Sequence, residues 1–111
     1  ILMQNAIGDH LVNNLSTHLV ARAAGIKMLE GASAPVWGID SIAGPTDSAL
    51  LFVDYKLAEL PGVYCKLPPP DQTPEVHEEV RRNAKIKAQL NAFFQPNGMI
   101  TNTCDGVCDP E

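Results

Sequence analysis

Residues 1–25 begin with Ile1-Leu-Met-Gln-Asn-Ala-Ile-Gly8-Asp9 and end with Val20-Ala-Arg-Ala-Ala-Gly25. Residues 1–7 have the length and hydrophobicity of a strand that is buried on both faces, and the Gly8-Asp9 pair ends this run. An amphipathic segment with capping side chains follows and closes on Gly25, which is typical of a helix that stops at a left-handed glycine. We therefore expect a strand that delivers Asp9 at its carboxyl end, then a loop and a helix. The apolar residues at helical spacing are predicted to face the core; they are Leu15, Leu19, Val20, Ala23 and Ala24.

Length and composition exclude several classes of protein. A chain of 111 residues with 45% hydrophobic residues is one small domain or a piece of a larger one. The formal net charge is -5 and the eight Lys and Arg residues do not cluster, which argues against a nucleic-acid-binding surface. No stretch approaches the roughly 20 apolar residues of a membrane span. The three histidines form no i, i+4 pair, and we expect neither a metal ion nor another cofactor.

The rest of the chain alternates between irregular segments and regular ones. Residues 26–48 are rich in Gly, Pro, Ser and Ala and are predicted to form a long loop, and residues 49–55 to form a second apolar strand. Residues 73–95 are predicted to form a helix, with Thr73 as its N-cap and a proline in first position. Four apolar residues of this helix recur at helical spacing and are predicted to face the core; they are Ile86, Leu90, Phe93 and Phe94.

This order of elements predicts an α/β fold. Continuous apolar strands that alternate with helices belong to a mainly parallel sheet with both faces covered. Two strands do not make a stable sheet by themselves. We therefore expect the chain to begin inside a larger sheet and to be incomplete as an independent domain. The remaining strands would come from a further N-terminal part or from another subunit.

The three cysteines bear on the compartment. Cys104 and Cys108 flank an Asp-Gly turn in the tail, residues 99–111, and this spacing favours a local disulfide over a zinc site. A disulfide implies an oxidising compartment, so we expect a secreted or periplasmic protein. Cys65 would then be either free and buried or paired with a segment outside this chain.

Two residues with the chemistry of acid–base catalysis follow the two predicted strands. Asp9 comes directly after the first strand, and His77 lies where the loop after the second strand becomes a helix. In open α/β sheets the functional crevice lies outside the carboxyl ends of the strands, so both residues are expected at the same edge. An acid that precedes a histidine matches the last two members of a Ser…Asp…His triad in α/β-hydrolase order. Asp54, at the end of the second strand, is the alternative acid.

The same residues resemble the C-terminal part of secreted bacterial α/β-hydrolases of the serine lipase and esterase type. Gly8-Asp9-His10-Leu11-Val12 resembles the acid-bearing turn of that family, where Gly-Asp-x-x-Val-Pro is frequent, and residues 14–25 are similar to its following helix. A histidine that opens the last helix, the run Gln89-Leu-Asn-Ala-Phe-Phe94 and the cysteine-containing tail are similar too. The resemblance covers most of this chain, but only the last two parallel strands and flanking helices of such an enzyme. Asn13 replaces the proline of the turn, and the residue after His77 is neither glycine nor aromatic.

The resemblance implies carboxylic ester hydrolysis, with Asp9 as the triad acid and His77 as the general base. His10 and Trp37 become candidates to line the site, and His18 is expected to be inert on a helix surface. The nucleophile is not in this chain, because no Gly-x-Ser-x-Gly elbow occurs. The serine would lie on a missing N-terminal part or on a partner chain, and the isolated chain would be inactive.

Simpler interpretations remain open for the same residues. Asp9 could have no role beyond capping the turn after its strand, and His77 could be an ordinary polar residue in the first turn of an exposed helix. The alternative function is a non-catalytic, small secreted binding module, stabilised by a disulfide between Cys104 and Cys108 and by oligomerisation.

Overall fold

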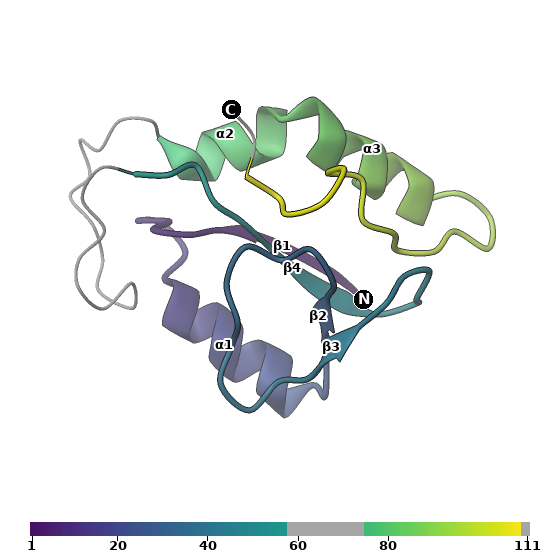
Figure 1. The fold of residues 1–111 in the computed structure, drawn as a ribbon, viewed down its shortest axis with the longest axis horizontal. Helices are drawn as coiled ribbons and strands as arrows, with labels where there is room; N and C mark the ends of the chain where they lie inside the picture. Colours follow the sequence, from purple (N-terminus) through teal and green to yellow (C-terminus); the bar gives the residue numbers. More distant parts are fainter. Residues whose placement is uncertain (58–74, 110–111) are drawn as a thin grey trace.

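Four parallel strands form one sheet in the computed structural model, which describes residues 1–57 and 75–109 (Figure 1). The order of the strands across the sheet is β1-β4-β2-β3. The two longer strands pair along their whole length, with Leu2 opposite Ala49 and Ala6 opposite Val53. The bounds of the strands are Leu2–Ala6 for β1, Met28–Leu29 for β2, Ser41–Ile42 for β3 and Ala49–Val53 for β4.

Helices cover both faces of this sheet, as the α/β prediction requires. Helix α1 (Asn14–Ala23) lies on one face, and α2 (Val76–Arg82) and α3 (Ala84–Phe93) lie on the other (Figure 1). Side chains of β4 alternate between two clusters of buried apolar residues. Leu51 belongs to the cluster beneath α2 and α3, and Phe52 belongs to the cluster beneath α1. The chain is therefore a small α/β unit with three layers.

The arrangement of β1 and β4 creates a topological switch point. These strands are neighbours, yet α1 follows β1 on one face and α2 follows β4 on the opposite face. In open α/β sheets, ligands bind outside the carboxyl ends of the strands at such a switch point. Residues 7–13 and the start of α2 flank this place.

The sheet contains two more strands than the sequence predicts. Residues 26–48 were expected to be a long loop, but they contain β2 and β3. Each of these strands has only two residues, which is too short for a periodic pattern to be visible in the sequence. β4 ends at Val53 rather than at residue 55. β1 is half-buried over Leu2, Met3 and Gln4 instead of buried on both faces, because it lies at one end of the described strand order.

The C-terminal helix predicted over residues 73–95 is two helices. Asn83 leaves the helical conformation with ψ 130° and caps α3, because its side chain accepts hydrogen bonds from the backbone N–H groups of Lys85 and Ile86. The predicted cap Thr73 lies outside the described residues. The N-cap of α2 is Glu75.

The predicted core stripe of α1 faces outward, which corrects the sequence-based expectation. Leu15, Leu19 and Val20 are exposed, and the buried positions of this helix are Asn14, Thr17, His18 and Ala21. Polar side chains occupy the inner face because they bond to one another and to β1, and because the ring of His18 packs edge-on against Phe52. Likewise, Phe94, the C-cap residue of α3, is 72% exposed, while Gln89 within that helix is fully buried and donates a hydrogen bond to the carbonyl of Thr101.

The predicted disulfide between Cys104 and Cys108 is present. Cys108 is fully buried, and its backbone connects two parts of the fold. Its N–H donates to the carbonyl of Gly31, and its carbonyl accepts from the N–H of Asp54. The tail is thereby held against the segments that follow β2 and β4.

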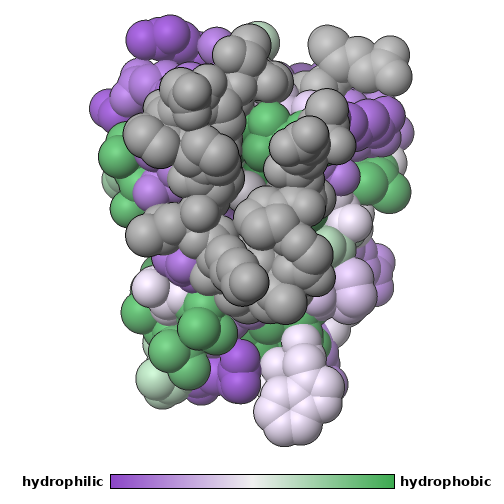
Figure 2. All heavy atoms as spheres, turned by 90° about the vertical axis from the view of Figure 1, so that its left-hand side faces the viewer, coloured by the Kyte–Doolittle hydropathy of each residue, from purple (hydrophilic) through white to green (hydrophobic). Residues whose placement is uncertain are grey.

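Hydrophobic and hydrophilic side chains both appear on the face of the molecule at the carboxyl ends of the strands (Figure 2).

Among the described residues, no helix has both the length and the apolar character that crossing a membrane demands.

The orientation of α1 can be tested by two matched leucine substitutions. Leu51→Ala removes a side chain that is fully buried in β4 and should lower the free energy of unfolding by about 2–5 kcal/mol. Leu19→Ala removes a side chain that is 56% exposed and should change it by no more than about 0.5 kcal/mol. Urea denaturation measures both values. A cost for Leu19→Ala as large as that for Leu51→Ala would show that the stripe is buried after all.

Candidate active site

The turn after β1 presents a buried carboxylate. Gly8 has φ 78°, a conformation that glycine adopts without the strain other residues incur. The Asp9 side chain is only 3% exposed, and its Oδ1 accepts hydrogen bonds of 2.8 Å from the backbone N–H groups of both Leu11 and Val12. These two donors fix the carboxylate and leave Oδ2 for another partner.

That partner is His77, in the first turn of α2. Its Nδ1 lies 2.8 Å from Asp9 Oδ2, across 68 positions of the sequence. An ionised carboxylate only accepts hydrogen bonds, so Nδ1 carries the proton in this contact. In the neutral imidazole with this tautomer, the other ring nitrogen, Nε2, carries no proton and can accept one. The side chain of His77 is 23% exposed, so solvent or a ligand can reach part of the ring. The structure thus brings the two predicted catalytic residues together.

A buried amide network supports the turn from below. Asn14, at the start of α1, is almost fully buried, and its Oδ1 accepts a hydrogen bond of 2.9 Å from the N–H of Gly8. Its Nδ2 donates to the carbonyl of Ala6 and to the side chain of Asn5. Asn5 in turn donates to Thr17 Oγ1. Asn14 therefore joins the end of β1, the acid turn and α1.

Sequence reasoning missed the roles of Asn14 and Glu75. Asn13 and Asn14 both have capping side chains, and Asn13 is the one that caps α1. The signal for Asn14 was its place beside a cap, where the acid turn meets the helix. The carboxylate of Glu75 accepts hydrogen bonds from the N–H groups of His77 and Glu78, so it fixes the first turn of α2. Its Oε1 also lies 3.4 Å from Nδ1 of His10, the residue next to Asp9.

The other residues considered from the sequence do not meet at this site. Trp37 is 85% exposed, and the guanidinium of Arg22, at the end of α1, lies over its ring. The acid turn adjoins the other end of α1, its beginning. The two ends of a helix of this length lie about 13 Å apart. Trp37 therefore does not line the site, contrary to expectation. The carboxylate of Asp54 accepts from the N–H of Lys56 in a local turn. Cys65 lies outside the described residues.

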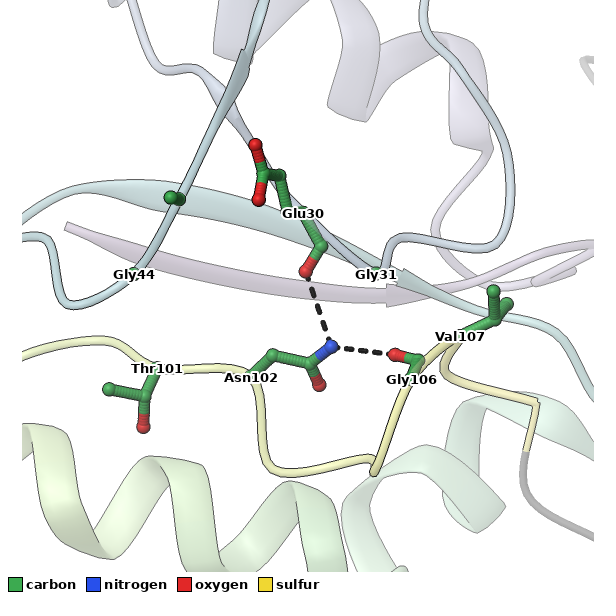
Figure 3. Close-up of a pocket in the computed structure, with 8 residues that line it drawn as sticks. Glu30, Gly31, Gly44, Thr101, Asn102, Gly106 and Val107 are labelled. Atoms are coloured by element: carbon green, nitrogen blue, oxygen red, sulfur yellow. Dashed lines mark hydrogen bonds between the residues drawn. The ribbon is translucent and has the colours of Figure 1, made fainter.

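A separate cavity lies beside the disulfide loop (Figure 3). Its volume is about 580 Å³, and neither Asp9 nor His77 lines it. Asn102 closes one side, because its Nδ2 donates to the carbonyls of Glu30 and Gly106. Gly31 is required there, because its φ of 92° favours glycine and a Cβ at this position would lie 2.5 Å from the backbone carbonyl oxygen of Gly106. These bonds organise the tail, and the cavity offers no side chains arranged for acid–base chemistry.

Comparison with family models, curated proteins and solved structures found no match to this chain. The geometry of the site and the sequence resemblance are therefore the basis for assigning a function.

His18 makes the stability of the fold depend on pH. It was expected on the helix surface, but it is buried, and burial together with the positive charge of Arg22 lowers its pKa from 6.5. The unfolded chain thus binds a proton at a higher pH than the folded protein. The free energy of unfolding should fall as the pH drops below 6.5 towards the lower folded pKa, and this contribution should be constant above 6.5.

The variant His18→Gln tests this assignment by urea denaturation at a series of pH values. The variant should lose stability less steeply than the wild type below pH 6.5. Between pH 7 and pH 8 the two curves should run parallel, which serves as the internal control. An equal slope for both proteins at acid pH would contradict the role of His18.

Proposed function

We propose that Asp9 and His77 are the acid and the general base of a Ser-Asp-His triad that hydrolyses carboxylic esters. The observation that carries this proposal is the 2.8 Å contact between His77 Nδ1 and the buried carboxylate of Asp9. Its position, at the carboxyl edge of a parallel sheet and beside a topological switch point, is where α/β enzymes keep their reacting groups. The resemblance of residues 8–12 to the acid turn of α/β-hydrolases adds to this support. In this proposal, β1 and β4 are the two strands of a larger hydrolase sheet that lead to the acid and to the general base.

The two residues have distinct roles in the proposed reaction. Asp9 holds the imidazole with its proton on Nδ1 and stabilises the positive charge that forms on the ring. Nε2 of His77 takes the proton of a serine hydroxyl as its oxygen attacks the ester carbonyl carbon, and then gives that proton to the departing alcohol. A water molecule, activated in the same way, hydrolyses the acyl-serine and releases the carboxylic acid.

The nucleophile in this proposal belongs to a polypeptide outside these 111 residues, which contain no Gly-x-Ser-x-Gly. The four serines of this chain do not fit that role. Ser33 donates its hydroxyl to the carbonyl of Phe52, and Ser16 is an exposed residue within α1. Ser41 and Ser48 lie in β3 and directly before β4, at the amino ends of the strands. The disulfide supports a secreted or periplasmic location for the assembled enzyme.

One observation favours a second candidate, a non-catalytic interaction module. The exposed positions of α1 carry Leu15, Leu19 and Val20 but no charged side chain. An uncharged apolar helix face is typical of a surface that meets another protein. This candidate needs no serine, so the two functions predict different chemical behaviour.

A serine-reactive fluorophosphonate and an ester substrate test the proposed function. The isolated chain should neither hydrolyse p-nitrophenyl acetate nor react with the fluorophosphonate, because it lacks the nucleophile and the oxyanion hole. The native preparation should hydrolyse the ester, and mass spectrometry should find the label on a serine in a Gly-x-Ser-x-Gly sequence of a second polypeptide segment.

Variants in the native assembly then test the two assigned roles. Asp9→Asn should lower kcat by up to about 10⁴-fold, because the imidazole loses the partner that selects its tautomer. His77→Ala should lower kcat at least as much, and the exposed control Asp47→Asn should leave it unchanged. A native protein that consists of these residues alone and folds as a monomer would contradict the hydrolase proposal. Full labelling of the serine by the fluorophosphonate in the His77→Ala variant would also contradict the hydrolase proposal.

A further inference from the structure

We propose that His10 and Glu75 are positioning residues, whose contact holds the Asp9 turn against the first turn of α2. This inference rests on the proposed function for its importance in catalysis. The contact joins His10 Nδ1 to Glu75 Oε1 at 3.4 Å. It lies beside the contact between Asp9 and His77, because His10 follows Asp9 and Glu75 precedes His77 by two residues.

The two contacts are reciprocal. The turn after β1 contributes the acid Asp9 and the imidazole of His10, and the start of α2 contributes the acid Glu75 and the imidazole of His77. Each segment therefore contributes one carboxylate and one imidazole, and each of the two pairs joins one segment to the other. A displacement of either segment that separates Asp9 from His77 must also separate His10 from Glu75, so the second pair opposes that displacement.

Burial gives the contact of His10 its importance. The side chain of His10 is 11% exposed, and its buried Nδ1 makes no hydrogen bond with the described part of the chain. A buried ring nitrogen that lacks a polar partner costs about 1–3 kcal/mol. Among the described residues, the carboxylate of Glu75, 3.4 Å away, is the acid that faces Nδ1, and it attracts the ring when the imidazole is protonated. At 3.4 Å this is a looser contact than a well-formed hydrogen bond of about 2.9 Å, and its strength depends on the length of the Glu75 side chain.

The choice of glutamate as the cap of α2 fits this role. Ser, Thr, Asp and Asn are the usual N-cap residues, because a short side chain reaches the free N–H groups of the first turn. Glu75 makes the same capping bonds with a longer side chain, to the N–H groups of His77 and Glu78. The additional methylene group is not needed for capping, and it allows the same carboxylate to reach His10 as well.

The difference in length between glutamate and aspartate at position 75 allows an experiment to distinguish the positioning role from the capping role. Glu75→Asp keeps the charge and the ability to cap α2, but its carboxylate is one methylene short of His10. His10→Ala removes the contact from the other side. His10→Gln retains an N–H donor that can reach Glu75. Glu78→Asp is the matched control, because it shortens a neighbouring carboxylate of the same helix that pairs with Arg81 and Arg82.

The readout is the proton on Nδ1 of His77, observed by NMR in the ¹⁵N-labelled chain together with the backbone amides of α2. In Glu75→Asp and His10→Ala this proton should exchange with solvent several-fold faster or broaden beyond detection. The amide signals of α2 should stay in place in Glu75→Asp. In His10→Gln and Glu78→Asp the proton should behave as in the wild type.

Unchanged exchange of the His77 proton in Glu75→Asp or in His10→Ala would overturn the inference. So would equal acceleration by Glu78→Asp, since any shortened carboxylate on the helix would then have the same effect. No ester or nucleophile enters this experiment. Failure of the assembled protein to hydrolyse esters would therefore refute the proposed function and leave the result on positioning unaffected.

Discussion

The hydrogen bond between His77 Nδ1 and Asp9 Oδ2 is the interaction on which the candidate site depends. Removing a carboxylate from water costs several kcal/mol unless its oxygens find donors in the protein. Asp9 finds three: the N–H groups of Leu11 and Val12 on one oxygen, and the imidazole on the other. The imidazole donor is the only one of these three that comes from a distant segment. This hydrogen bond therefore satisfies a buried charge and also joins the end of β1 to the start of α2.

The parallel sheet brings the two segments together, and polar groups beneath them hold their positions. β1 and β4 are adjacent and point the same way, so the segments that follow them start from one edge. Asn14 then anchors the acid turn to β1, and its partners occupy the inner face of α1. This arrangement explains why α1 turns Leu19 outward. The inner face is used to support the turn, and the apolar residues that remain lie on the outer face.

Much of this arrangement follows from the sequence, and the exceptions have physical causes. The apolar runs before Asp9 and at residues 49–55 predict parallel strands, and parallel strands place Asp9 and His77 at one edge. Residues 26–48 contain strands too short for any periodicity to show. The break at Asn83 depends on one side chain that caps the next turn, which a hydrophobic pattern does not report. The face of α1 could not be predicted, because periodicity locates an apolar stripe without showing whether buried polar bonds outweigh it.

A double-mutant cycle between Asp9 and His77 tests the central claim most directly. The free energies of unfolding of Asp9→Ala, His77→Ala and the double variant are measured by urea denaturation at pH 7 and compared with the wild type. We predict a coupling energy of about 1–3 kcal/mol, because each single variant breaks the same buried hydrogen bond. The control pair Asp40→Ala and His77→Ala should be additive, since Asp40 lies at the amino end of β3. A coupling energy for Asp9 and His77 below about 0.3 kcal/mol would contradict the account, because the two residues would then act independently.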